Sequence, residues 1–381
     1  MRLNLGAGAA PLENYDNTFD DHQGKEAFPL ALPDGCADEV RASHLLEHFN
    51  HRGAHKVVAD WMRVLKPGGL LKIAVPDLEE ICRMHVAGEP GQYQGWLSGG
   101  QVDGRDIHLA QYDWHSLSAL LRGSGLVGLH KWAGDGGDCS TLPISLNIAG
   151  WKRMPSYPKT IAVMSRPRLG FMDQFGCAMD ALLPRGIPVY HRQGVYWGKC
   201  LTLAIEAALE DRAEWILTLD YDTLFRPEDI EDLMMLMSKG SAMVLGGPDA
   251  LVPVQIHRMS DRLLMNPKEG TPGITQADMD QPYYPIRTGH FGCTLIHADI
   301  FSRLKKPWFY PTYKEDGEPQ YDDDINFWLE FEKAGLKVFL TPRVTVGHLE
   351  AVVMWPDRKL KMLYQKTNDW REQGKPREVW R

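Results

Sequence analysis

The feature that most constrains the fold is a break in the pattern of the chain at residues 150–158. Two prolines and a basic pair in this segment separate a strand-like run at 144–149 from another at 160–164. On both sides, short β-type runs alternate with amphipathic helical stretches, as in α/β domains with largely parallel sheets. We therefore predict two α/β domains and a basic tail, which span 1–152, 157–356 and 357–381.

The composition excludes several classes of protein. The apolar content of 44% and the charged content of 24% are those of ordinary globular proteins. No apolar run approaches the roughly 18 residues of a membrane span, and the N-terminus turns to glycine where a signal peptide would need an apolar stretch. The six cysteines form no CxxC pair, which argues against a cysteine-bound zinc site and for reduced thiols. We expect a cytoplasmic protein without a membrane span.

The charge of the chain is unevenly distributed. A net charge of −8 does not favour nucleic-acid binding as the main activity. The stretch 358–381 reverses this sign, with eight Lys and Arg against three Asp and Glu, and contains Trp370 and Trp380. Such a segment is commonly a solvated terminal helix or strap, although it could contact phosphates or stack on bases. Nucleic acid therefore stays open as a partner only through this tail.

The first domain opens with an apolar strand that runs into a glycine turn, LNLGAG at residues 3–8. Glycine lets the backbone approach a ligand closely because it has no Cβ, although the same turn also ends ordinary strands. A helix-like run at 54–65 then carries its apolar residues on one face and ends in KPGG at 66–69. A strand at 70–75 follows, and it is succeeded by Pro76 and Asp77.

Together with the motifs LPDG at 32–35 and SHLLEHF at 43–49, this series resembles the class I SAM-dependent methyltransferases over about residues 1–150. The resemblance implies a Rossmann-like methyltransferase fold and the cofactor S-adenosylmethionine. Glu47 and His48 would lie in the loop beside the cofactor, or simply hold that loop. The residues that the resemblance implies at the SAM-binding site are Asn4, Gly6, Gly8, Asp20 and His44, with Asp21 as the alternative to Asp20 for the ribose hydroxyls.

No residue of this first half stands out as a necessary base. Methyl transfer can proceed largely by positioning of the two reactants. The sequence therefore favours cofactor binding more directly than it favours a particular catalytic step.

The second domain contains an apolar strand at 215–219 that ends in a DxD motif, Asp220-Tyr221-Asp222. A departing diphosphate needs its growing negative charge neutralised, and a hard divalent cation held by carboxylate oxygens does this. A DxD motif is common by chance. The buried strand before it and the helix start at 225–229 after it favour the interpretation as a metal site.

Three further groups of polar residues occur at the predicted ends of elements. Arg166 and Arg168 follow the strand at 160–164, where they suit phosphate or a nucleotide base or form surface salt bridges. Three acids at 322–324 precede a helix at 325–334, which they would cap unless a site holds them. A strand ends in His348, which taken alone would be a core or surface histidine.

The order of these residues resembles the GT-A-fold glycosyltransferases, close to the family 2-like inverting enzymes, over about residues 157–356. The resemblance implies a GT-A nucleotide-diphospho-sugar transferase fold that binds Mn²⁺ or Mg²⁺ through Asp222, Asp220 and His348. It implies Asp324 as the general base, with Asp323 as the alternative. The residues implied at the nucleotide-sugar-binding site are Arg166, Arg168, Lys199, Asp220 and Tyr221.

We therefore predict a bifunctional transferase. Its glycosyltransferase domain would move a sugar from a nucleotide-sugar donor to the hydroxyl of a glycan or other acceptor, by in-line displacement with inversion. Its SAM-dependent methyltransferase-like domain would methylate the glycan or the acceptor. A nucleotidyltransferase, or a binding or assembly protein with a vestigial methyltransferase domain, are the alternatives, because a fold alone does not establish an activity.

Overall fold

The computed structural model describes residues 1–8, 11–19, 25–134, 137–167, 170–256, 263–268, 274–275, 278, 281–356, 359 and 361–379. The chain divides into two compact units. The first contains Met1–Tyr157 and Met234–Ser238, and the second contains Pro158–Leu233 and Lys239–Arg381. The first junction falls inside the segment 150–158, where the prolines interrupt the pattern. None of the helices in the described part combines the length and the apolar character that crossing a membrane requires.

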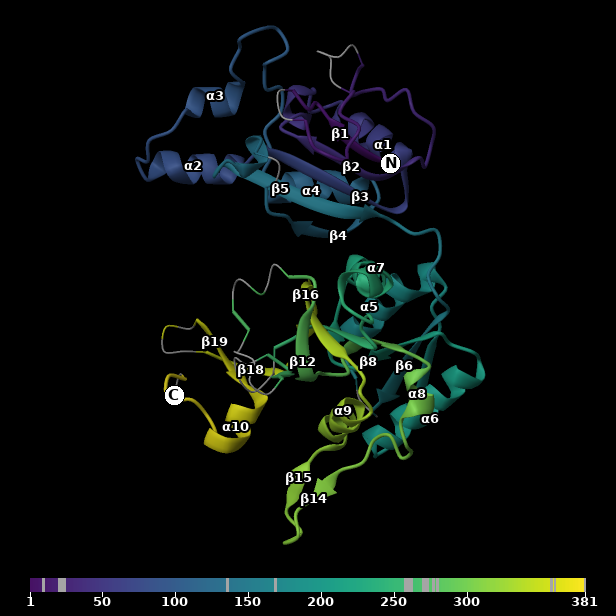
Figure 1. Ribbon diagram of the computed structural model, residues 1–381. Helices are drawn as coiled ribbons and strands as arrows, with labels where there is room; N and C mark the ends of the chain where they lie inside the picture. The colour runs from purple at the N-terminus through teal and green to yellow at the C-terminus, as the bar shows by residue number, and fades with distance from the viewer. Residues whose placement is uncertain are drawn as a thin grey trace. The chain divides into compact units, whose positions relative to one another are not determined.

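A five-stranded sheet with the order β1-β2-β3-β5-β4 forms the centre of the N-terminal unit (Figure 1). The strands β1 to β3 are parallel to one another, and β5 is antiparallel to both β3 and β4. The bounds of these strands are β1 (Arg2–Leu5), β2 (Ala37–Ser43), β3 (Leu65–Pro76), β4 (Leu126–Lys131) and β5 (Ser145–Lys152).

Amphipathic helices cover this sheet. Trp61 of α1 is fully buried, together with Val57 and Val58 on the same face of that helix. The helix predicted at 54–65 is thus α1. The helices of the unit are η2 (Leu46–His48), α1 (Ala54–Val64), α2 (Leu78–Val86), α3 (Tyr93–Ser98), α4 (Trp114–Gly123) and η3 (Cys139–Thr141).

The strand predicted at 70–75 is longer in the structure, because β3 begins at Leu65 and includes the KPGG segment. The pairing with β2 shifts in register between Ala37 and Glu39, and Gly68 has a φ of +69°. A Cβ on Gly69 would lie 2.9 Å from the carbonyl oxygen of Lys66. The glycine pair therefore forms an irregularity within the strand in addition to ending the helix before it.

An eight-stranded sheet with the order β11-β12-β16-β10-β13-β8-β6-β7 forms the C-terminal unit. Strands β6, β7 and β8 are parallel, whereas β13 lies antiparallel between β8 and β10. Both sheets are therefore mixed, where the alternation of elements suggested largely parallel ones. The bounds are β6 (Thr160–Arg166), β7 (Val189–Gln193), β8 (Trp215–Leu219), β10 (Ala250–Val254), β11 (Asn266–Pro267), β12 (Tyr284–Thr288), β13 (Cys293–His297) and β16 (Val338–Thr345).

An aromatic core packs against this sheet. Phe327 stacks on Phe309 with ring centroids 4.9 Å apart, and Phe291 stacks on Trp328 at 5.1 Å. These contacts anchor α9 through its buried face. The helices of this unit are α5 (Met172–Leu182), η4 (Leu183–Arg185), α6 (Trp197–Glu210), α7 (Pro227–Met243), α8 (Ile300–Arg303), α9 (Asp323–Lys333) and α10 (Thr367–Gln373).

Three two-stranded sheets complete the unit, and the one formed by β14 and β15 projects beside α9 in Figure 1. The boundary expected at residue 356 lies within the hairpin formed by β18 and β19, at the end of β18. Helix α10 follows this hairpin. The side chains of Trp370 and Trp380 lie outside the described residues. The paired strands are β9 (Thr223–Leu224) with β17 (Gly347–His348), β14 (Thr312–Tyr313) with β15 (Pro319–Tyr321), and β18 (Val352–Pro356) with β19 (Met362–Lys366).

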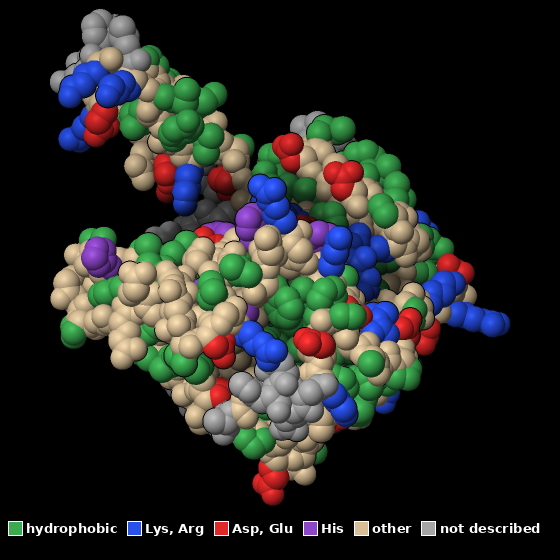
Figure 2. Space-filling view, turned by 90° about the horizontal axis from the view of Figure 1, so that it is seen from above, with side chains coloured by type: hydrophobic (Ala, Val, Ile, Leu, Met, Phe, Trp, Pro, Cys, Tyr) green, Lys and Arg blue, Asp and Glu red, His purple; other side chains and the backbone are tan. Residues whose placement is uncertain are grey.

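The surface carries charges of both signs. On the face that Figure 2 shows, lysine and arginine side chains lie among acidic and apolar ones. This mixture agrees with the modest net charge of −8 over 381 residues.

Candidate functional site

The DxD motif follows the carboxyl end of strand β8, an inner strand of the larger sheet. All five residues of β8 are buried, and Asp220 is the first residue beyond it. The amide of Asp220 donates to the carbonyl oxygen of Gly292 at 3.2 Å, at the start of the neighbouring β13. The indole nitrogen of Trp197 donates to Oδ1 of Asp220 at 3.4 Å. The backbone and the side chain of Asp220 are therefore both held by distant parts of the chain.

His348 lies beside the second acid of the motif. It pairs with Thr223 across the short sheet of β9 and β17, and its Nε2 is 3.4 Å from Oδ2 of Asp222. Its Nδ1 lies 3.1 Å from the carbonyl oxygen of Ile256 and must donate there, because a carbonyl only accepts. In the neutral ring the lone pair of Nε2 then faces a carboxylate oxygen. This contact requires a proton or a cation between the two atoms, so the pair fits a metal ion.

Asp220 carries the electrostatic consequence of this arrangement. Burial, reinforced by the charges of Asp222 and Asp324, raises the pKa of Asp220 to about 6, against the effects of the Trp197 hydrogen bond and of His348. The structure thus brings Asp220, Asp222, Asp324 and His348 together. Within the described residues, however, the ligand atoms of Asp220, Asp222 and His348 do not all lie within 4.8 Å of one another. Asp222 and His348 are in contact, while Asp220 interacts with both of them electrostatically at longer range.

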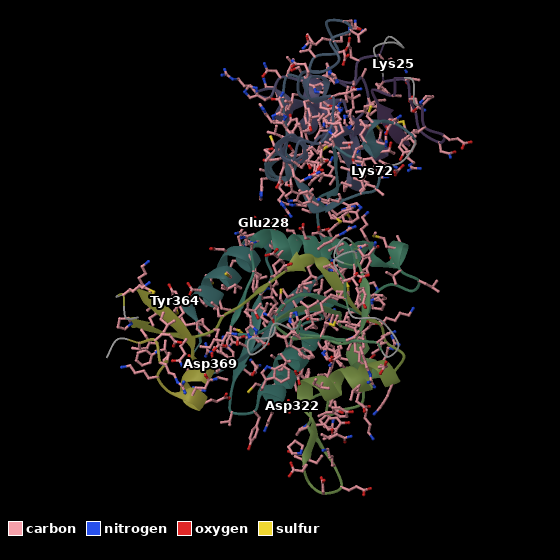
Figure 3. The ribbon with its side chains drawn as sticks, turned by 90° about the vertical axis from the view of Figure 1, so that its left-hand side faces the viewer. Lys25, Lys72, Glu228, Asp322, Tyr364 and Asp369 are labelled. Carbon is pink, nitrogen blue, oxygen red and sulfur yellow. The ribbon has the colours of Figure 1, made fainter. Side chains whose placement is uncertain are left out.

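The three acids at 322–324 open α9. Asp322, labelled in Figure 3 beside the β14–β15 hairpin, occupies the N-cap position without a capping hydrogen bond from its side chain. Oδ1 of Asp324 accepts the amide of Ile325 at 2.7 Å, and burial raises the pKa of Asp324. Oδ2 of Asp323 lies 2.6 Å from the position that a Cβ would take on Gly198. Asp323 therefore packs against α6, and Asp324 is the acid coupled to Asp220.

The residues expected at the nucleotide are more dispersed. Arg166 ends β6, is exposed and donates to Oε1 of Gln193 at 3.5 Å. Tyr221 stacks on Phe171, with ring centroids 6.4 Å apart and planes 4° apart. Lys199 is exposed on α6. Arg168 lies outside the described residues.

Two residues near the DxD motif were not anticipated from the sequence. Trp197 is one, since it is 23 positions away from Asp220 and no local pattern links them. His290 is the other: it is buried, its Nε2 donates to the carbonyl oxygen of Pro253, and its Nδ1 accepts the amide of Gly292. Burial lowers the pKa of His290 to about 4, so this ring is neutral and holds the Gly292 backbone that binds Asp220.

A second candidate site is a cavity of about 560 Å³ in the N-terminal unit, a volume that suits a cofactor. Gly6 and Gly8 line it with φ values of +62° and +52°. A Cβ on Gly6 would lie 2.9 Å from Cδ1 of Leu45, whereas a Cβ on Gly8 would enter open space. The glycine turn therefore leaves a cradle that side chains would fill, and S-adenosylmethionine fits this position.

The other residues expected at the cofactor differ in their positions. His44 lines the cavity with a φ of +49°. Asn4 is buried: its amide nitrogen donates to Oδ1 of Asn17 at 2.8 Å, and its oxygen accepts from Arg41 at 3.2 Å. Asn4 is not among the residues that line the cavity. Asp20 and Asp21 lie outside the described residues, directly after Phe19, whose carbonyl accepts the amide of Gly6 at 2.9 Å.

Two solved structures show a distant likeness to this chain. A197 from STIV is 14% identical, with a TM-score of 0.36, over 54% of this chain and 94% of that one. A SAM-dependent methyltransferase from Thermotoga maritima, a possible histamine N-methyltransferase, is 16% identical, with a TM-score of 0.27, over 40% of this chain and 82% of that one. At these scores the likenesses carry no weight for the function of this chain. No curated protein matches the sequence.

Family models match a segment in each half of the chain. One described as glycosyl transferase family 2 matches residues 178–305, which include the DxD motif and end before Asp324. Another, described as a methyltransferase domain, matches residues 13–73. These matches confirm the two resemblances and their order along the α/β chain. The chain thus matches a methyltransferase domain in its first part and a glycosyl transferase family 2 domain in its second, as a fusion of the two would.

Proposed function

We propose that the C-terminal domain is a metal-dependent, inverting glycosyltransferase that moves a sugar from a nucleotide-sugar donor to a hydroxyl acceptor. The observation that carries the proposal is the contact between Asp222 and His348 beside the partly buried carboxyl of Asp220. Asp222, His348 and Asp220 would hold Mn²⁺ or Mg²⁺, which would stabilise the negative charge of the departing diphosphate.

Asp324 is the base of the proposed reaction. Its Oδ1 accepts the amide of Ile325, so this hydrogen bond fixes the carboxylate at the start of α9. Burial raises its pKa, and a carboxylate with a raised pKa accepts a proton from an acceptor hydroxyl more readily than an exposed one. The resulting oxygen nucleophile would attack the anomeric carbon from the face opposite the diphosphate, which inverts the configuration.

The first experiment measures Mn²⁺-dependent hydrolysis and transfer over a panel of nucleotide sugars. We expect Asp222→Ala and Asp324→Asn each to lower kcat by at least about 100-fold, the scale of a lost general base or charge-stabilising group. Asp299→Asn is the matched control, because Asp299 is exposed and makes no capping hydrogen bond. Activity that survives both site substitutions would contradict the assignment.

A second activity is supported by the cavity beside Gly6 and Gly8. We propose that it binds S-adenosylmethionine, which supplies an electrophilic methyl group, and that the acceptor is the same glycan or another molecule. Gly8 keeps the wall of the cavity free of a side chain, and His44 lies on the same cavity.

Calorimetry with S-adenosylmethionine on the full chain tests this second activity. We expect Gly8→Ala to weaken binding at least about tenfold, because its Cβ would enter the cavity and a φ of +52° is strained for alanine. Gly88→Ala is the matched control, since Gly88 has a φ of +70°, open space around it and no place on the cavity. Equal binding by the two variants would argue against the cofactor site.

A further inference from the structure

Three potential metal ligands converge beside the N-terminal cavity. The ligand atoms of Glu47, His48 and His108 lie within 4.8 Å of one another, and this is the only such group of His, Cys, Asp and Glu among the described residues. Glu47 and His48 come from η2, and His108 follows α3. The His48 and His108 rings meet edge to face, with centroids 4.9 Å apart. Neither proposed transfer reaction uses these three side chains.

The hydrogen bonds of the two histidines determine where their lone pairs lie. Nδ1 of His48 is 3.2 Å from the carbonyl oxygen of Ile107, and Nδ1 of His108 is 3.0 Å from that of Trp96. Both nitrogens must donate, because carbonyl oxygens only accept. In the neutral rings the lone pairs are therefore on Nε2. Histidines that bind metals are oriented in this way, with the other nitrogen donating to a backbone carbonyl or a carboxylate.

Glu47 places a carboxylate in the interior of the protein without a hydrogen bond. Its exposure is 1%, and neither carboxylate oxygen has a hydrogen-bond partner in the described structure. One group that could provide a positive charge is His44, whose Nδ1 is 3.3 Å from Oε1. Burying a carboxylate without compensation is unfavourable, and a cation bound at Glu47 would offset this penalty.

The other ring nitrogen of His44 is held by a chain of hydrogen bonds. The amide nitrogen of Asn147 donates to the carbonyl of Ser140, so its Oδ1 accepts from the hydroxyl of Ser145 at 2.8 Å. The Ser145 oxygen must then accept from Nε2 of His44 at 2.9 Å. Nε2 therefore carries a proton, and Nδ1 faces Glu47 with a lone pair in the neutral ring or with a second proton in the charged ring. A metal ion bound by Glu47 would take the place of that second proton.

We propose that Glu47, His48 and His108 bind one divalent transition-metal ion. Two imidazole nitrogens and one carboxylate oxygen form a donor set that suits Zn²⁺ and leaves a fourth position open. His48 lines the cavity together with Ile107, so the open position would be available to an oxygen atom of a molecule bound there. The lack of CxxC pairs in the sequence argues only against a zinc site with cysteine ligands, and the proposed site has no cysteine ligand. The site does not depend on whether the cavity binds S-adenosylmethionine.

The test measures zinc affinity of the full chain by competition with a chromogenic chelator. All proteins carry Asp222→Asn, which disables the other candidate metal site. We expect one zinc ion per chain, with affinity reduced at least about tenfold by His48→Gln and by His108→Gln, since even outer-shell changes have effects of that size. His55→Gln is the matched control, because His55 is exposed on α1.

A near-isosteric substitution keeps the test decisive if a histidine variant does not fold. Glu47→Gln removes the charge and preserves the shape, so the metal-free variant should melt at the same temperature as its parent or higher, and bind zinc at least about tenfold more weakly. Calorimetry with S-adenosylmethionine on the same proteins reports separately on the cavity. No zinc bound by the parent, or an affinity that Glu47→Gln leaves unchanged, would overturn the proposal.

Discussion

At the scale of single residues, the carboxyl group of Asp220 shows how the proposed donor site opposes the stability of the fold. It is partly buried beside two other acids, and its pKa of about 6 lies well above the ordinary 3.8 of an aspartate. The ionised form that a metal ion would bind is the form that the metal-free protein accommodates poorly. Metal affinity should therefore fall as the pH is lowered through about 6.

We predict that Asp220→Asn stabilises the metal-free protein at pH 7.5 by about 1–3 kcal/mol, since each unit of pKa shift corresponds to about 1.4 kcal/mol. Folding raises the pKa of Asp220, so protonated Asp220 stabilises the wild-type fold. This stabilisation is complete below the ordinary pKa of 3.8 and is lost as the pH rises through about 6. The advantage of the variant should therefore be smaller at pH 5. Urea unfolding at both pH values measures it, and no gain at pH 7.5 would contradict the account of Asp220.

At the scale of elements, a buried ion pair joins β2 to η3 in the methyltransferase domain. Arg41 is 1% exposed, and its Nη1 lies 2.8 Å from Oδ2 of Asp138. Asp138 also accepts the amide of Ser140 at 2.9 Å and thereby caps η3. Burial would raise the pKa of Asp138, but the guanidinium of Arg41 and the hydrogen bonds from Ser140 prevail and hold it at about 2.

We predict that Asp138→Asn lowers the free energy of unfolding by about 3–5 kcal/mol, because Arg41 loses the carboxylate that pairs with its buried charge. The stabilisation is present above the unfolded pKa of 3.8 and should disappear as the pH falls toward 2. Urea unfolding at neutral pH measures the loss. Asp34→Asn is the control: its bond to Arg63 is largely exposed, so it should cost less than about 1 kcal/mol. Equal losses in the two variants would exclude this role for Asp138.

At the scale of the whole molecule, the two compact units have separate hydrophobic cores. The proposed cofactor cavity lies in the first unit and the proposed donor site in the second. A ligand that binds only the folded state stabilises the unit that contains its site, by about 2.7 kcal/mol at 100 times its dissociation constant.

Scanning calorimetry should therefore resolve two transitions that respond to different ligands. We expect S-adenosylmethionine to raise the melting temperature of one, and a nucleoside diphosphate with Mn²⁺ to raise that of the other. Asp222→Asn should abolish the second response and leave the first unchanged. A single transition that both ligands shift equally would show that the units do not unfold independently.

The local elements could be predicted from the sequence, because apolar periodicity and glycine or proline breaks act within a few neighbouring residues. The run 215–219 is β8 in the structure, and the run 54–65 is α1. Its motifs also identified both domains and their order. The roles of the individual site residues are still predictions.

Which distant residues meet could be learned only from the folded chain. No local pattern indicates that β13 runs antiparallel beside β8, that Trp197 donates to Asp220, or that His108 approaches Glu47 and His48. These contacts depend on strand order, register and loop paths, which the periodicity of a single segment does not specify. The DxD motif was therefore visible in the sequence, while its coupling to His348 and the convergence of ligands beside the cavity required the folded chain.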